Sequence, residues 1–164
     1  MTFEEYQKEA VKFRTETADN EEYLTLGLIE EVGEAAGKLA KRRRDVVWDE
    51  KAFIKELGDI LWFVANLADY YDLENNTKIS DELKECFEAE VDDASFDDDI
   101  MRLLVYWVGY FLDGECWRLI DIVYEVGGIA KNHGYTLEQL AEINLAKLRD
   151  RAARGKIQGN GDER

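Results

Sequence analysis

Two groups of acidic residues stand about twenty positions apart in the first half of the chain. The first is Glu30, Glu31 and Glu34, in the stretch LIEEVGEAAG, and the second is Glu56 and Asp59, in KELGDILWF. An α-helix turns about 100° per residue, so the first three carboxylates share one arc, and Glu56 and Asp59 lie about 60° apart on theirs. Carboxylates on two neighbouring helices could hold a metal ion or transfer a proton.

The simplest explanation of the first group is the solvated face of an amphipathic helix. The opposite side is apolar and carries Leu28, Val32, Ala35 and Leu39. However, Gly27, Gly33 and Gly37 lie within or beside the acidic arc, and each costs about 1 kcal/mol relative to alanine inside a helix. We therefore expect something to approach this side of the helix closely.

The second group stands next to apolar residues, which predicts that Glu56 is partly desolvated. Carboxylates at 4 Å repel by about 1 kcal/mol per pair in water and about 4 kcal/mol at an effective dielectric of 20. Either some are protonated or a cation is present. Oxygen ligands favour Mg²⁺ or Mn²⁺, and a di-iron site is disfavoured because His133 is the only histidine.

Near the end of the chain, one side of a predicted helix carries Asn144, Lys147, Arg151 and Arg154, which could bind a polyphosphate. Asn144 falls within an apolar stripe, so its amide needs a hydrogen-bonding partner. The alternative is a basic helix end that complements the helix dipole. The other basic residues after the first acidic group, and His133 in a predicted loop, are given no role.

Composition limits the class of protein. The chain has 164 residues, no proline and a net charge of −16, which disfavours nucleic acid or an anionic membrane as a partner. We expect one domain over residues 1–154 and a flexible tail over 155–164. Cys86 and Cys116 suggest buried free thiols in the cytoplasm, and no signal peptide or membrane span is predicted.

The periodicity predicts an all-α fold. Two helices should begin at the capping boxes of Thr2 with Glu5 and of Thr136 with Gln139, and the last should reach about Ala153. The other expected helices run from Asp19 or Asn20 to KRRRD, from near Asp49 to about Tyr71, from a cap at Ser80, from about Asp99 to Asp113, and from about Glu115 to Asn132. The acidic segment 88–99 is expected to be a solvated loop. DILWFVANLA from Asp59 and DIVYEVGGIA from Asp121 resemble each other, which suggests a degenerate second copy of a helix pair.

The acidic pattern of residues 30–34 and 56–59, followed by ILWF, resembles the MazG-like nucleotide pyrophosphohydrolases of the all-α NTP pyrophosphatase superfamily. The segment AEINLAKLRDRAARGKIQGNGDER resembles the end of small single-domain bacterial and phage members. The resemblance implies a four-helix-bundle-like fold, from which residues 72–131 depart as an extra helical insertion. A homodimer or higher homo-oligomer is expected, or a bundle completed by the second copy within one chain.

The resemblance also implies roles for these residues. Glu31, Glu34, Glu56 and Asp59 would hold Mg²⁺, with Mn²⁺ as an alternative. Glu30 would orient or deprotonate water. Asn144, Lys147 and Arg151 would contact phosphates.

The implied reaction cleaves a nucleoside triphosphate between its α and β phosphates and removes non-standard nucleotides. The nearest aromatic candidates for the base are Trp48, Trp62 and Phe63, although aromatics at helical spacing more often belong to a core. A dUTP- or dCTP-selective pyrophosphatase is an alternative, and so is a non-enzymatic helical interaction protein.

Overall fold

The computed structural model describes residues 1–45, 48–89 and 96–156, and these residues contain helices and no strand. The all-α prediction is confirmed. The longest helices are α2 and α3, which follow one another in the chain. The elements are α1 (Phe3–Ala10), η1 (Val11–Phe13), η2 (Glu16–Ala18), α2 (Glu21–Arg44), α3 (Glu50–Asn75), α4 (Ile79–Glu88), α5 (Asp97–Leu112), α6 (Arg118–Asn132) and α7 (Leu137–Ala153).

Side-chain caps begin four of these helices where the sequence predicted them. Thr2 and Thr136 each form a capping box, with Glu5 and Gln139 respectively. Asn20 accepts from the backbone of Tyr23 at the start of α2, and Asp49 accepts from that of Ala52 at the start of α3. These caps satisfy backbone N–H groups that a helix leaves unpaired in its first turn.

The predicted cap at Ser80 is wrong, and the physical reason lies in the preceding helix. α3 continues past Tyr71 to Asn75, so Asp72 remains helical and points its carboxylate at the start of α4. That carboxylate accepts from the backbone N–H groups of Ile79 at 2.9 Å and Ser80 at 3.0 Å. A side chain of the preceding helix thus caps α4, which begins at Ile79.

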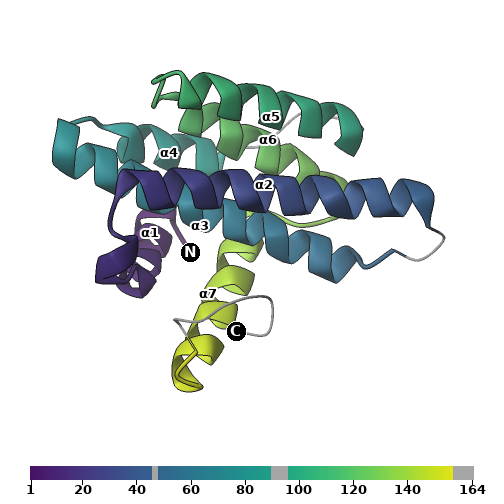
Figure 1. Ribbon diagram of the computed structural model, residues 1–164, viewed down its shortest axis with the longest axis horizontal. Helices are drawn as coiled ribbons and strands as arrows, with labels where there is room; N and C mark the ends of the chain where they lie inside the picture. Colours follow the sequence, from purple (N-terminus) through teal and green to yellow (C-terminus); the bar gives the residue numbers. More distant parts are fainter. Residues whose placement is uncertain (46–47, 90–95, 157–164) are drawn as a thin grey trace.

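The two long helices form one layer of a four-helix arrangement, and α5 with α6 forms the other (Figure 1). α2 packs along α3, α5 packs along α6, and the layers meet where α3 contacts α6 and α2 contacts α5. α7 crosses α3, and α1 packs against α3, α4 and α7. One chain therefore supplies the four helices that the family resemblance predicted. The homodimer stays a prediction.

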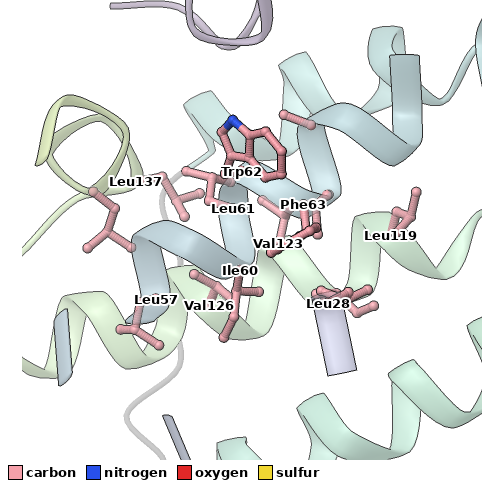
Figure 2. Packing of buried hydrophobic residues seen from close by; sticks show 14 of the residues in the cluster. Leu28, Leu57, Ile60, Leu61, Trp62, Phe63, Leu119, Val123, Val126 and Leu137 are labelled. Atoms are coloured by element: carbon pink, nitrogen blue, oxygen red, sulfur yellow. The ribbon is translucent and has the colours of Figure 1, made fainter. Parts of the chain in front are cut away.

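α3 is the central helix of the core. All residues from Glu56 to Ala68 are buried, whereas the sequence predicted an apolar stripe on one side. In Figure 2, Leu57 and Ile60 of α3 lie beside Val126 of α6, whereas Leu61 lies toward Leu137 at the start of α7. A carboxylate on such a helix is taken out of water unless it lies at an opening.

The C-terminal half differs from expectation only at helix ends. α5 begins at Asp97, two residues before the predicted Asp99, and α6 begins at Arg118, after a turn over the predicted start. Asp97 lies 3.1 Å from Arg42, so the basic end of α2 contacts the acidic start of α5. None of the described helices meets the length and hydropathy needed to cross a bilayer. Residues 90–95 of the expected acidic loop and 157–164 of the expected tail lie outside the described residues.

Candidate metal and nucleotide site

Three of the predicted acids converge between α2 and α3. Glu31, Glu56 and Asp59 each offer a carboxylate oxygen, and these oxygens all lie within 4.8 Å of one another. Glu31 comes from α2, and the other two come from successive turns of α3. Oxygen ligands at this separation fit a hard divalent cation such as Mg²⁺.

Two carboxyls of this group, Glu31 and Glu56, are difficult to ionise without a cation. Burial raises the pKa of Glu31 from 4.5 to about 8, and the negative charge of Asp59 acts in the same direction. Burial also raises the pKa of Glu56, again with Asp59 as the second cause. The expected desolvation of Glu56 is thus confirmed, since only 9% of this residue is exposed.

Two lysines neutralise part of this negative charge. Lys38 of α2 lies 3.3 Å from Glu56, and Lys147 of α7 donates to Asp59. Each lysine also lowers the pKa of a carboxyl in the group: Lys38 that of Glu56, and Lys147 that of Glu31. From the sequence, a solvated helix end explains Lys38 equally well, so no role is predicted for it.

Glu34 and Glu30 lie on the open side of α2. Both are exposed, and neither belongs to the close group of three. The charge of Glu34 nevertheless contributes to the raised pKa values of Glu31 and Glu56, so it lies within electrostatic reach of both. Glu30 lines a pocket together with Glu31 and Asp59.

α7 approaches α3 closely enough to hold Asp59. A Cβ on Gly58 would lie 3.3 Å from the Cβ of Asn144, so glycine permits this helix crossing. The Asn144 amide donates to Asp59 at 2.8 Å, and its carbonyl accepts from the hydroxyl of Tyr6 at 3.1 Å. Asp59 and Tyr6 are thus the hydrogen-bonding partners that the buried amide of Asn144 was predicted to need.

A pocket opens beside the acids and combines aromatic and polar walls. Asn144 and Arg151 of α7 lie on its polar side. Trp62 and Phe63 form its aromatic side, with their ring centroids 4.8 Å apart and nearly perpendicular. The remaining lining residues are Phe13, Thr15, Ala18, Tyr23, Glu30, Glu31, Asp59 and Leu148.

Sequence reasoning missed the segment between α1 and α2. Phe13, Thr15 and Ala18 line the pocket from this segment, which carries no acidic or glycine-rich motif. Arg14 anchors it through ion pairs with Asp19 at 3.1 Å and Asp69 at 2.7 Å. The side chain of Arg14 is almost completely buried, and nothing in the surrounding sequence predicts its structural role.

Three residues weighed from the sequence, Trp48, His133 and Arg154, lie outside the pocket lining. Trp48 packs against Phe53 and His133, away from the pocket lining. His133 follows α6 in the loop where the sequence placed it, with its ring nitrogens 2.6 Å from Glu50 and 3.0 Å from Asp97. Arg154 pairs with Asp150 on the exposed end of α7.

The close approach expected at the three glycines of α2 occurs at one of them, Gly27. A Cβ on Gly27 would lie 2.2 Å from the ring of Phe63, so the close neighbour is a pocket wall. Gly33 and Gly37 would carry a Cβ with nothing within 4 Å, and the described residues therefore give no reason for these two glycines.

Comparison with known proteins finds a family match over the region of the α2–α3 helix pair. Residues 19–88 match the MazG nucleotide pyrophosphohydrolase domain. The matched residues include α2, α3 and α4. The match continues past residue 72, where the sequence analysis began the insertion.

A phage protein is similar to part of the chain. The chain is 43% identical over 56 residues to the Gene 37 protein of Mycobacterium phage L5, and the alignment covers 31% of this chain and 49% of the relative. The chain thus spans about half the length of that relative. No solved structure matches the chain significantly.

Proposed function

We propose that the protein is a Mg²⁺-dependent nucleoside triphosphate pyrophosphohydrolase that releases pyrophosphate and a nucleoside monophosphate. The observation that carries the proposal is the group of Glu31, Glu56 and Asp59, whose oxygens converge within 4.8 Å beside a pocket. The MazG domain match over residues 19–88 supports the reaction class.

The acids fit the donor chemistry of Mg²⁺, with Mn²⁺ as the alternative metal. Glu31, Glu56 and Asp59 would ligate it, and Glu34 would join them from the next turn of α2. When bound, the ion would neutralise charge on the polyphosphate and favour departure of pyrophosphate. The raised pKa of Glu31 fits this role, because a group that ionises with difficulty alone ionises readily beside a cation.

Glu30 is the candidate base. It lies one residue from Glu31, is exposed, and lines the same pocket, so its carboxylate can reach water that enters with the substrate. There it would orient the attacking water toward the α-phosphorus and accept its proton.

Cationic side chains of α7 would hold the phosphates. Arg151 lines the pocket, and its guanidinium can bind two phosphate oxygens at once. Lys147 contacts Asp59 in this structure, and a cation bound by Asp59 would release the ammonium group toward a phosphate. Asn144 already uses both ends of its amide, so we propose that it positions Asp59 and does not bind phosphate.

The aromatic wall of the pocket would bind the nucleobase of the substrate. Trp62 and Phe63 present ring surfaces beside the acids, and Tyr23 lies 6.2 Å from Phe63 between centroids. Stacking on such rings tolerates different bases. Selectivity for dUTP or dCTP would need polar contacts to the base edge from the segment around Thr15.

Product analysis tests the proposal. Standard and modified ribo- and deoxyribonucleoside triphosphates are incubated with the protein and Mg²⁺, and pyrophosphate and orthophosphate are measured separately. Pyrophosphate with an equimolar monophosphate is expected, and the Asp59→Asn variant serves as the matched control. Orthophosphate with a diphosphate would contradict the cleavage position, and no product from any substrate would favour the non-enzymatic interaction protein.

A further inference from the structure

The helix pair α5–α6 repeats the helix pair α2–α3 in sequence and burial. Residues 28–35, LIEEVGEA, align without a gap with residues 104–111, LVYWVGYF. Leu28 and Val32 are buried, as are their counterparts Leu104 and Val108, while Gly33 and Gly109 are both exposed. On the second helix of each pair, residues 59–68 align in the same way with residues 121–130.

The packing has the symmetry expected of two copies. α3 contacts α6, its counterpart, and α2 contacts α5, its counterpart (Figure 1). In a two-fold interface the same surface of each copy meets itself. The pairs therefore meet as two subunits of a homodimer would, although they belong to one chain.

Neighbours in the first pair have neighbouring counterparts in the second. The charge of Glu56 raises the pKa of Glu31, and the charge of Glu34 raises the pKa of Glu56, so the three carboxyls are neighbours. By the alignment, Trp107 and Tyr110 correspond to these two glutamates, and Arg118 corresponds to Glu56. The Arg118 guanidinium lies 5.1 Å from the ring centroid of Trp107 and 5.7 Å from that of Tyr110.

The chemistry of the second pair is reversed. Where the first pair presents Glu56, the second presents a guanidinium, which lies 3.1 Å from Asp121 and 2.7 Å from Glu115. Asp121 corresponds to Asp59 and is thus already neutralised within its own helix. Indole and phenol rings in place of two glutamates stabilise a cation by their faces and do not ligate Mg²⁺.

We propose that α5–α6 is a degenerate copy of the catalytic pair, in which Arg118 supplies the positive charge that a metal ion supplies to α2–α3. Each chain then has a single metal and substrate site, and its second half completes the bundle in place of another subunit. The proposal rests on the proposed function, because it takes the acids of α2–α3 as the metal site.

Binding stoichiometry tests the proposal. Titration calorimetry with Mn²⁺ and a non-hydrolysable triphosphate analogue should give one metal-dependent nucleotide site per chain, and Asp59→Asn should abolish it. Two sites per chain, or a site that survives in Asp59→Asn, would overturn the degenerate copy. The absence of any site in the wild-type protein would instead overturn the proposed function.

Matched substitutions at Glu56 and Arg118 give a second readout that does not depend on activity. Glu56→Gln should abolish the rise in Tm that Mg²⁺ produces, whereas Arg118→Gln should retain that rise in full. Arg102→Gln, at an exposed position of α5, controls for loss of a surface charge. A loss of the Mg²⁺ effect in Arg118→Gln, with Arg102→Gln unaffected, would place the metal in α5–α6 and overturn the proposal.

Discussion

The side-chain amide of Asn144 on α7 donates to Asp59 on α3 at 2.8 Å. The hydroxyl of Tyr6 on α1 donates to the same amide at 3.1 Å. Both side chains are almost completely buried, so this short relay fixes the orientation of one carboxylate from two other helices. Outer hydrogen-bonding partners of this kind orient metal ligands and tune their affinity.

Tyr6→Phe should therefore weaken metal binding although Tyr6 is not itself a proposed metal ligand. We expect the Kd for Mg²⁺ to rise by about tenfold, because Asn144 loses the donor that holds it. The free energy of unfolding should fall by about 1 kcal/mol. Calorimetric titration and denaturant unfolding measure the two effects, with the exposed Tyr124→Phe as control. An unchanged Kd would show that the relay does not set the position of Asp59.

The substitutions Glu34→Gln and Asp59→Asn should each abolish pyrophosphate release while the fold survives. Removing one negative charge reduces the repulsion among the carboxylates of the metal-free protein, which for Asp59→Asn offsets the lost ion pair with Lys147, so the Tm should change little. Circular dichroism and thermal melting check the fold, and pyrophosphate release checks activity. Full activity in either variant would show that the metal ligands have been assigned wrongly.

Stabilisation by Mg²⁺ should grow as the pH rises from about 6 to about 8.5. The folded-state pKa of Glu31, about 8, lies above its ordinary value of 4.5, so its contribution to stability is complete below about pH 4.5. That contribution is lost as the pH rises from about 4.5 through 8, because the unfolded chain ionises in this range before the buried carboxyl does. Mg²⁺ binds the ionised form and restores stability as RT ln(1 + [L]/Kd).

Thermal melting with and without Mg²⁺ across this pH range measures the effect. Glu31→Gln is the control, since it removes the group that titrates and should flatten the dependence. A difference in Tm that is constant over the range, or that shrinks at higher pH, would contradict the assignment of Glu31 as a ligand.

The sequence was sufficient for the parts of the structure that depend on local chemistry. Capping residues such as Asn20 and Asp49 act within one turn, so the starts of α2 and α3 could be predicted from their neighbours alone. Helical periodicity likewise placed the acids of α2 and α3 on defined sides of their helices.

What could not be predicted depends on contacts between different helices and segments. Asp72 caps α4 across a turn, and Tyr6 reaches Asn144 over 138 residues. The pocket wall at Thr15 comes from a segment with no motif, which Arg14 holds against α3. Such positions follow from the packing of whole helices, which no local pattern encodes.

Two glycines of α2 make a matched pair for the last prediction. Gly27→Ala should destabilise the protein by about 1–3 kcal/mol, because its Cβ would lie 2.2 Å from the Phe63 ring and force that ring toward the pocket. Gly33→Ala should instead stabilise it by up to about 1 kcal/mol, since alanine favours the helix and its Cβ meets nothing within 4 Å. Denaturant unfolding gives both values, and KM for the nucleotide should change only in Gly27→Ala. A destabilised Gly33→Ala would point to a close contact made on the open side of α2.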